Sequence, residues 1–202
     1  MAKIIGISAS PRKGMSTEYY IKILLSEIKK ESSKKIDTEQ INLSSAVVKP
    51  CIACDYCKTH FDCSQDDTFK KEFIDKLKDD DLKGIVFGSP VYMGGITALG
   101  KAFLDRTVLF RRNNFHFKNM VGGAFSIGNS RNGGQELTLS NIHHAFLIHD
   151  MIIVGDGFST SHFGGSAWFG NPAGFKDDPD GTSTTLHLAK RMVEMFKLLK
   201  YI

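Results

Sequence analysis

Short apolar runs and longer segments with helical periodicity alternate along this chain. The short runs predict buried β-strands, over residues 3–8, 37–43, 83–90, 120–128 and 151–156. The segments that follow them repeat apolar residues at three- and four-residue intervals and predict helices, over about 20–28, 66–78, 92–110, 135–148 and 182–199. Strands that alternate with helices favour an α/β fold with a parallel sheet.

The order of these elements predicts how the sheet is built. Helices after each strand cover both faces of a parallel sheet, and five strands with five helices predict a flavodoxin-like doubly wound fold of strand order 2-1-3-4-5. No repeat or linker divides the chain, so we expect one domain over residues 1–202. An irregular segment at about 157–180 is too long for a plain connection. We expect it to be functional, an oligomer contact or both.

Composition and charge narrow the function classes. With 42% hydrophobic and 24% charged residues, the chain has ordinary globular composition and needs no disulfides to stabilise its core. No run reaches the roughly 18 apolar residues of a membrane span, and the N-terminus lacks the apolar core of a signal peptide. We therefore expect a cytoplasmic protein that binds no membrane. The net charge of +4 comes from scattered residues without aromatic interleaving, which argues against nucleic acid as a partner.

The loop after the first strand, SASPRKGMST, has the chemistry of a phosphate site. It offers hydroxyl groups, one guanidinium and a helix N-terminus, which suits a phosphate dianion. The loop matches neither the Walker pattern nor GxGxxG, so a monophosphate such as that of FMN fits better than a triphosphate or a dinucleotide. The alternative is that its hydroxyls only cap the first helix. The candidate contacts are Ser10, Arg12, Ser16 and Thr17.

Two more loops leave the same edge of the predicted sheet. Their glycines let backbone approach a flat ring closely, Tyr92 and Met93 offer side chains for its face, and loop N–H groups can bond its polar rim. The alternative for each loop is a turn glycine beside a core aromatic residue. The candidate ring contacts are Pro90, Val91, Tyr92, Met93 and Gly94 after the third strand, and Asn129, Ser130, Arg131, Gly133, Gly134 and Gln135 after the fourth.

All four cysteines lie in the segment 49–65, with the spacing Cys-x2-Cys-x2-Cys-x5-Cys. Local runs of this kind supply thiolates to iron–sulfur clusters, and with no other cysteine in the chain all four would serve one centre. A single [4Fe-4S] cluster is the favoured interpretation. Zinc sites more often use two separated Cys-x2-Cys pairs, and zinc, disulfides or a thiol relay stay as alternatives. The candidate ligands are Cys51, Cys54, Cys57 and Cys63.

Taken together, these motifs resemble a known family. SASPRKGMST, PVYMGG, the cysteine run and the stretch from RRNNFHF to SRNGGQE resemble the iron–sulfur flavoproteins of methanogenic archaea and other anaerobes, within the NADPH-dependent FMN reductase and flavodoxin-like superfamily. The resemblance implies FMN, one [4Fe-4S] cluster per subunit held by the four cysteines, and a homotetramer. It also implies electron transfer from ferredoxin, with dioxygen or peroxide among the acceptors.

Three hypotheses follow from the sequence. The first is an electron-transfer iron–sulfur flavoprotein in which a cluster passes single electrons and a flavin collects two; it needs no catalytic acid, base or nucleophile. The alternative is an NAD(P)H-dependent FMN or quinone reductase without a functional cluster. The third is a flavin-binding redox sensor without enzymatic activity, which the absence of an appended effector domain disfavours.

Overall fold

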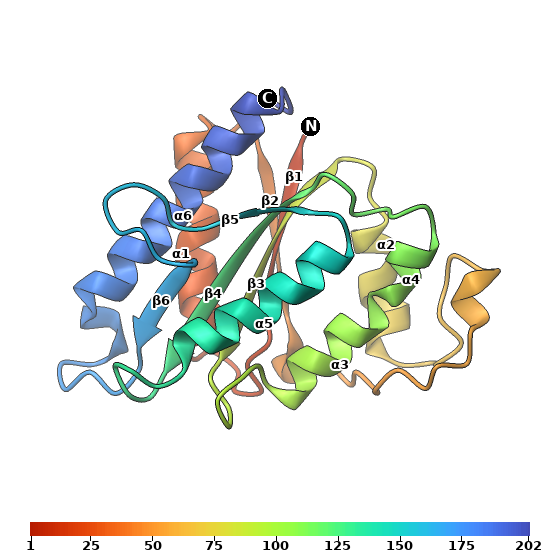
Figure 1. The fold of residues 1–202 in the computed structure, drawn as a ribbon, viewed down its shortest axis with the longest axis horizontal. Coiled ribbons are helices and arrows are strands. Elements are labelled where there is room, and N and C mark those ends of the chain that lie inside the picture. Colours follow the sequence, from red (N-terminus) through yellow and green to blue (C-terminus); the bar gives the residue numbers. More distant parts are fainter.

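The strands of the computed structural model, which describes residues 1–202, form a parallel sheet of order β2-β1-β3-β4-β5 (Figure 1). The flavodoxin-like order predicted from the sequence is therefore confirmed. Apolar runs form these strands because both faces of each central strand are buried; every residue of the fourth strand is buried. The bounds are β1 Lys3–Ser8, β2 Asp37–Asn42, β3 Leu82–Pro90, β4 Val121–Gly128 and β5 Ile152–Val154.

Helices cover both faces of the sheet, as Figure 1 shows. Two of them lie side by side on one face and share a core with it, α1 Ser16–Glu31 and α6 Pro179–Leu198. The other face carries a π-helical turn at Phe69–Phe73 followed by α2 Ile74–Leu77, and then α3 Ala98–Arg106, α4 Val108–Arg112 and α5 Gln135–Ile148. Three short 3-10 helices lie in the loops, at Leu43–Ser45, Tyr56–Lys58 and Phe175–Asp177. No helix has the length and apolar character needed to cross a bilayer.

The segment at 157–180 is not wholly irregular, which corrects the sequence interpretation. It contains a sixth strand, β6 Gly165–Trp168, which pairs with Phe125–Gly128 of β4. The fifth strand pairs only with Val121–Gly123, so β6 takes up the position beside β4 that β5 leaves. A strand of four residues that begins with glycine gives no detectable apolar period, and for that reason the sequence did not reveal it.

Four helices begin at other residues than predicted, among them α1 at Ser16 and α3 at Ala98. The last helix starts at Pro179 because Asp178 caps it by accepting a hydrogen bond from Gly181 N (3.1 Å). The helix expected over 66–78 begins only at Phe69, as a π-helical turn. In these last two helices the shifted start does not change which face is buried: it is the face that the apolar spacing predicted.

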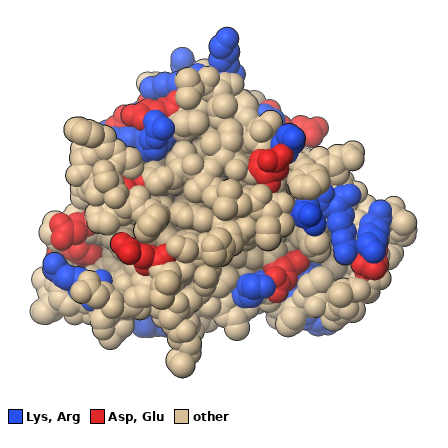
Figure 2. Space-filling model, in the orientation of Figure 1, with Lys and Arg blue, Asp and Glu red and all other residues tan.

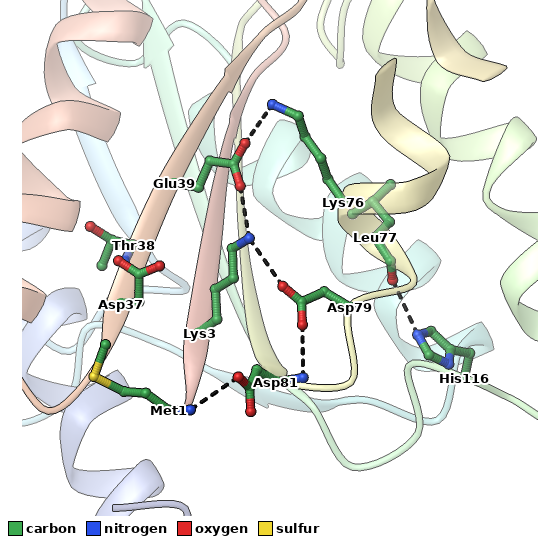
Figure 3. Close-up of polar contacts among 10 residues, drawn as sticks. All are labelled: Met1, Lys3, Asp37, Thr38, Glu39, Lys76, Leu77, Asp79, Asp81 and His116. Carbon is green, nitrogen blue, oxygen red and sulfur yellow. Dashed lines mark hydrogen bonds and ion pairs between the residues drawn. The ribbon is translucent and has the colours of Figure 1, made fainter. Parts of the chain in front are cut away.

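A polar network ties together the edge where the strands begin (Figure 3). Lys3 Nζ contacts Glu39 Oε2 at 2.8 Å and Asp79 Oδ2 at 3.2 Å, so one ammonium joins β1, β2 and the turn before β3. Lys76 also pairs with Glu39. Because all strands are parallel, their carboxyl ends gather at the opposite edge, where doubly wound sheets bind their ligands.

Candidate functional site

Three loops meet at the carboxyl edge of the sheet. Thr97 caps α3 by accepting from Gly100 N, and its hydroxyl donates to Ala9 O (2.7 Å), which fixes the loop after β1. A Cβ built on Gly134 would lie 3.3 Å from Val91 Cγ1, so the loops after β3 and β4 are in contact. The structure therefore brings together the three loops that the sequence assigned to one ligand.

The loop after β1 has unsatisfied polar groups. Ser8 Oγ and Thr17 Oγ1 are buried and have no hydrogen-bond partner, although buried hydroxyls normally have one. Ser10 Oγ accepts from Arg12 N (3.1 Å) and so shapes the turn. The residue before α1 is Met15, and no side chain caps this helix. The capping alternative is therefore wrong, and the hydroxyls of Ser16 and Thr17 lie in the first turn of α1, where they suit an anion.

Arg12 has no carboxylate partner. Its guanidinium lies over the ring of Phe169, 5.2 Å from the centroid, and Phe169 stacks in turn on Phe175 at a centroid distance of 5.8 Å. The ring of Phe169, from the segment at 157–180, thus packs against the side chain of Arg12. An uncompensated positive charge in the same loop is what a phosphate monoester would require.

The loop after β3 forms a tight two-residue turn. Tyr92 and Gly95 exchange backbone hydrogen bonds of 2.9 and 3.1 Å, with Met93 and Gly94 at φ +48° and +78° between them. This turn points the Met93 side chain fully into solvent and leaves Tyr92 half exposed. Tyr92 is therefore no core aromatic. Pro90 ends β3, and Val91 N donates to Ile127 O (2.9 Å).

Gln135 holds the loop after β4 in shape. Its side chain is buried, accepts from Gly133 N (2.7 Å) and donates to Ser130 O (2.8 Å). Gly134 at φ +95° precedes α5. This makes Gln135 a structural support of the loop, and the exposed surface is left to Asn129, Ser130, Arg131 and Asn132.

Trp168 of β6 packs against the same loop. Its indole N–H donates to Asn129 O (3.0 Å), and the guanidinium of Arg131 lies 5.1 Å from its ring centroid. Arg131 forms a cation–π contact and no ion pair. The positive charge of Arg131 stays available at the rim of the loop.

The four cysteines line one small cavity of about 20 Å³ and form no disulfide. Cys57 and Cys63 are half-buried and pack against the core, whereas Cys51 and Cys54 are exposed. Figure 1 shows this loop projecting beside α4, on the side of the molecule away from α6. All four predicted ligands thus surround one space, with two of them packed against the core and two exposed to solvent.

A buried ion pair closes the base of the cysteine loop. Arg106 of α3 donates to Asp67 Oδ2 (2.8 Å) and to Lys49 O (3.0 Å), and Asp67 accepts from Lys49 N (2.9 Å). One arginine therefore joins the two ends of the loop. Burial alone would raise the pKa of Asp67, but the hydrogen bonds from Arg106 and Lys49 outweigh it and lower that pKa below its ordinary value.

Polar groups also surround individual cysteines. Arg112 Nη1 donates to Cys57 Sγ at 3.2 Å, and this contact raises the pKa of the guanidinium. Cys54 Sγ and Ser64 Oγ share a hydrogen bond of 3.0 Å, which lowers the pKa of the Cys54 thiol. Sequence reasoning missed Arg106, because nothing local relates it to residues far earlier in the chain. It assigned no role to Arg112.

The four thiols are soft donors that suit zinc or an iron–sulfur cluster. A zinc ion needs sulfur atoms about 2.3 Å from a single point; no three His, Cys, Asp or Glu side chains converge on one point in this structure, so the geometry by itself favours neither centre. A cubane holds each thiolate at a separate iron, so its ligands are spread around a cavity. The cysteines fit that donor set, and Arg112, which lines the same cavity, suits its negative charge.

A groove connects the cysteine loop with the loop after β3. Cys51 and Ala53 line it on one side, and Tyr92, Met93 and Gly95 on another. The first two belong to the predicted cluster loop, and the others lie at the predicted flavin edge. The two candidate sites therefore open onto one surface of the same chain.

Comparison with known proteins identifies the family. The family model described as NADPH-dependent FMN reductase matches residues 2–165. An iron-sulfur flavoprotein of Methanosarcina thermophila is 44% identical over 198 residues, which are 98% of this chain and 97% of that protein. The chain belongs to the iron–sulfur flavoproteins of this reductase family. Another member, from Methanocaldococcus jannaschii, is 42% identical to this chain. The match covers 98% of this chain and 99% of that protein.

Membership of the iron–sulfur flavoproteins makes the chain an oxidoreductase and supports FMN as its flavin. The crystal structure of RosB with a bound derivative of riboflavin 5'-phosphate has the same fold, with a TM-score of 0.70 and 16% identity. That likeness covers 99% of this chain and 81% of RosB. At this identity it supports the fold alone, in agreement with the sheet order described above.

Proposed function

We propose that this chain is an electron-transfer iron–sulfur flavoprotein. Ferredoxin is its donor, Cys51, Cys54, Cys57 and Cys63 hold one [4Fe-4S] cluster, and FMN lies at the carboxyl edge of the sheet. A cluster exchanges single electrons and FMN holds two, so together they supply the conversion of a one-electron donor into a two-electron reductant. The acceptor we propose is a two-electron oxidant such as dioxygen or peroxide.

The groove shared by the two candidate sites is the observation that carries this proposal. It has Cys51 on the same surface as Tyr92 and Met93, so the cluster loop and the flavin edge open onto one shared groove. Electron transfer needs proximity and a fixed geometry more than it needs an acid or a base. Accordingly, no residue of the site is assigned a catalytic proton transfer.

The residues of the flavin edge have distinct roles in this proposal. The unpartnered hydroxyls of Ser8 and Thr17, the Ser10 turn and the free charge of Arg12 bind the phosphate. The turn at Tyr92 and the Gln135-supported loop orient the ring. Arg131 contributes positive charge at its rim. These roles are local, so each loop can be altered separately.

We also propose that copies of this chain associate as a homotetramer. Helix α5 exposes Leu137, Leu147 and Ile148, and Figure 2 shows a broad area with few charges in the region that α5 occupies in Figure 1. Exposed apolar surface of this kind favours a protein contact. A second copy of the chain is the occupant that the family resemblance implies.

Cys57→Ala tests the path of the electrons. In anaerobic stopped-flow mixing, reduced ferredoxin should reduce FMN in the wild type and should fail to do so in Cys57→Ala, while dithionite reduces the flavin of both. Ile52→Ala, in the same loop but without a ligand atom, is the matched control and should behave as the wild type. Loss of FMN from Cys57→Ala would show that the two sites depend on one another and would contradict the proposal.

An NAD(P)H-dependent FMN or quinone reductase is the second candidate, favoured by the matched family model. Anaerobic stopped-flow mixing also distinguishes these two candidate functions. Rapid flavin reduction by NADPH, at an equal rate in the wild type and in Cys57→Ala, would support the reductase. A slow reaction with NADPH next to a fast one with ferredoxin supports electron transfer through the cluster.

A further inference from the structure

Arg112 is the charged residue most closely tied to one cysteine. It lies at the end of α4, where Nη1 donates to Cys57 Sγ at 3.2 Å and Nη2 lies 2.9 Å from Asp55 Oδ1. The next residue, Asn113, donates to Cys57 O at 3.3 Å. The guanidinium is thus held on both sides, by the thiol and by a carboxylate from the turn that precedes Cys57.

The charges around Cys57 do not cancel. Asp55 also pairs with Lys58 at 2.8 Å, so two cations share one carboxylate and one positive charge remains. Arg106, by contrast, is neutralised by its own buried partner, Asp67. Figure 2 shows Lys and Arg side chains close together in the region where Figure 1 places α4 and the cysteine loop.

We propose that Arg112 is a positioning residue that raises the reduction potential of the cluster through its hydrogen bond to Cys57 Sγ. The inference rests on the proposed function, because it requires a cluster on these cysteines. Adding one electron makes the cluster more negative, so a nearby cation and N–H donor stabilise the reduced form more than the oxidised form. Hydrogen bonds to cluster sulfurs and local charge are established determinants of such potentials.

The neighbouring arginine provides the matched control. Arg111 is exposed, lies over the ring of Phe115 at 5.4 Å and makes no hydrogen bond to a cysteine. Arg111→Gln and Arg112→Gln therefore remove the same charge from adjacent positions, and only the second also removes a donor to a thiolate. Arg112→Lys keeps the charge but loses the planar fork that binds thiol and carboxylate together.

An anaerobic redox titration of the FMN-loaded, cluster-loaded protein, followed by the EPR signal of the reduced cluster, tests the proposal. At the midpoint of the wild type, Arg112→Gln should lower the ratio of reduced to oxidised cluster about tenfold, a shift of about 59 mV for one electron. Arg112→Lys should fall between Arg112→Gln and the wild type, and Arg111→Gln should match the wild type.

Two results overturn the proposal. One is an equal midpoint in Arg112→Gln and Arg111→Gln. The other is loss of iron and sulfide from Arg112→Gln alone, which would make Arg112 an assembly residue. If the wild type itself contains no cluster, the proposed function has failed, and iron analysis of that sample identifies this case separately.

Discussion

The ion pair between Asp67 and Arg106 shows how single residues shape the site. Both side chains are 1% exposed, and together they bind both backbone groups of Lys49 at the other end of the cysteine loop. A buried pair stabilises little when compared with apolar residues, but removing one partner leaves the other charge buried and alone. In this chain the pair of Asp67 and Arg106 holds together the two ends of the loop that carries the thiols.

Asp67→Asn should lower the free energy of unfolding by about 3 kcal/mol at pH 7, because it leaves Arg106 without a counter-charge. Urea unfolding measures this effect. Asp66→Asn, at an exposed carboxylate paired with Lys71, should cost less than about 1 kcal/mol. An equal loss in both variants would contradict the role assigned to Asp67.

The same variant has a predicted pH dependence. The pKa of Asp67 is lower in the folded chain than in the unfolded chain, where it is about 3.9. Its stabilisation is therefore complete above that unfolded value and is lost as the pH falls through the lower folded value. The difference in unfolding free energy between the wild type and Asp67→Asn should shrink on acidification below pH 4.

At the residue scale, sequence alone revealed the groups that occur in local patterns. The cysteines share one short motif, and the hydroxyls share one loop. Arg106 and Asp67 are 39 residues apart, and Arg112 and Cys57 are 55 apart. No periodicity links residues so distant, so these contacts became visible only once the helices were packed against the loop.

At the element scale, the loops at the carboxyl edge support one another. The sequence placed them on one edge because parallel strands end together. It could not show that Gly134 touches Val91, nor that β6 continues the sheet beside β4, because both depend on tertiary packing. The strands with long apolar runs were predicted within a residue or two, and β6 was missed because its four residues have no such run.

Gly134→Ala should weaken FMN binding about tenfold, since a methyl group there would lie 3.3 Å from Val91 Cγ1 and push the two flavin loops apart. Gly174→Ala is the matched control, with a similar φ of +96° but its nearest atom 3.9 Å away. Alanine at Gly134, with ψ +17°, carries the cost of a left-handed residue, about 1–2 kcal/mol. Gly174 has ψ +153°, a conformation that essentially only glycine adopts, so the control carries at least as large a backbone cost. Titration of the apoprotein with FMN, followed by flavin fluorescence, should therefore separate them, and equal affinities would be the contrary result.

At the scale of the whole molecule, the net charge of +4 matches the proposed cofactors. A [4Fe-4S] core with four thiolates carries about −2, and the FMN phosphate about −2. The loaded subunit would then be close to neutral, which suits association into a tetramer through the weakly charged face over α5. Basic residues that look like a surplus in the sequence are thus accounted for without a polyanionic partner.

Iron, acid-labile sulfide and FMN, counted per chain after strictly anaerobic purification, test the central claim most directly. We expect about four iron and four sulfide for each chain, together with about one FMN, and a brown protein whose reduced form gives a cluster EPR signal. A yellow protein that contains FMN but takes up no iron on reconstitution, or one that holds only zinc, would contradict it.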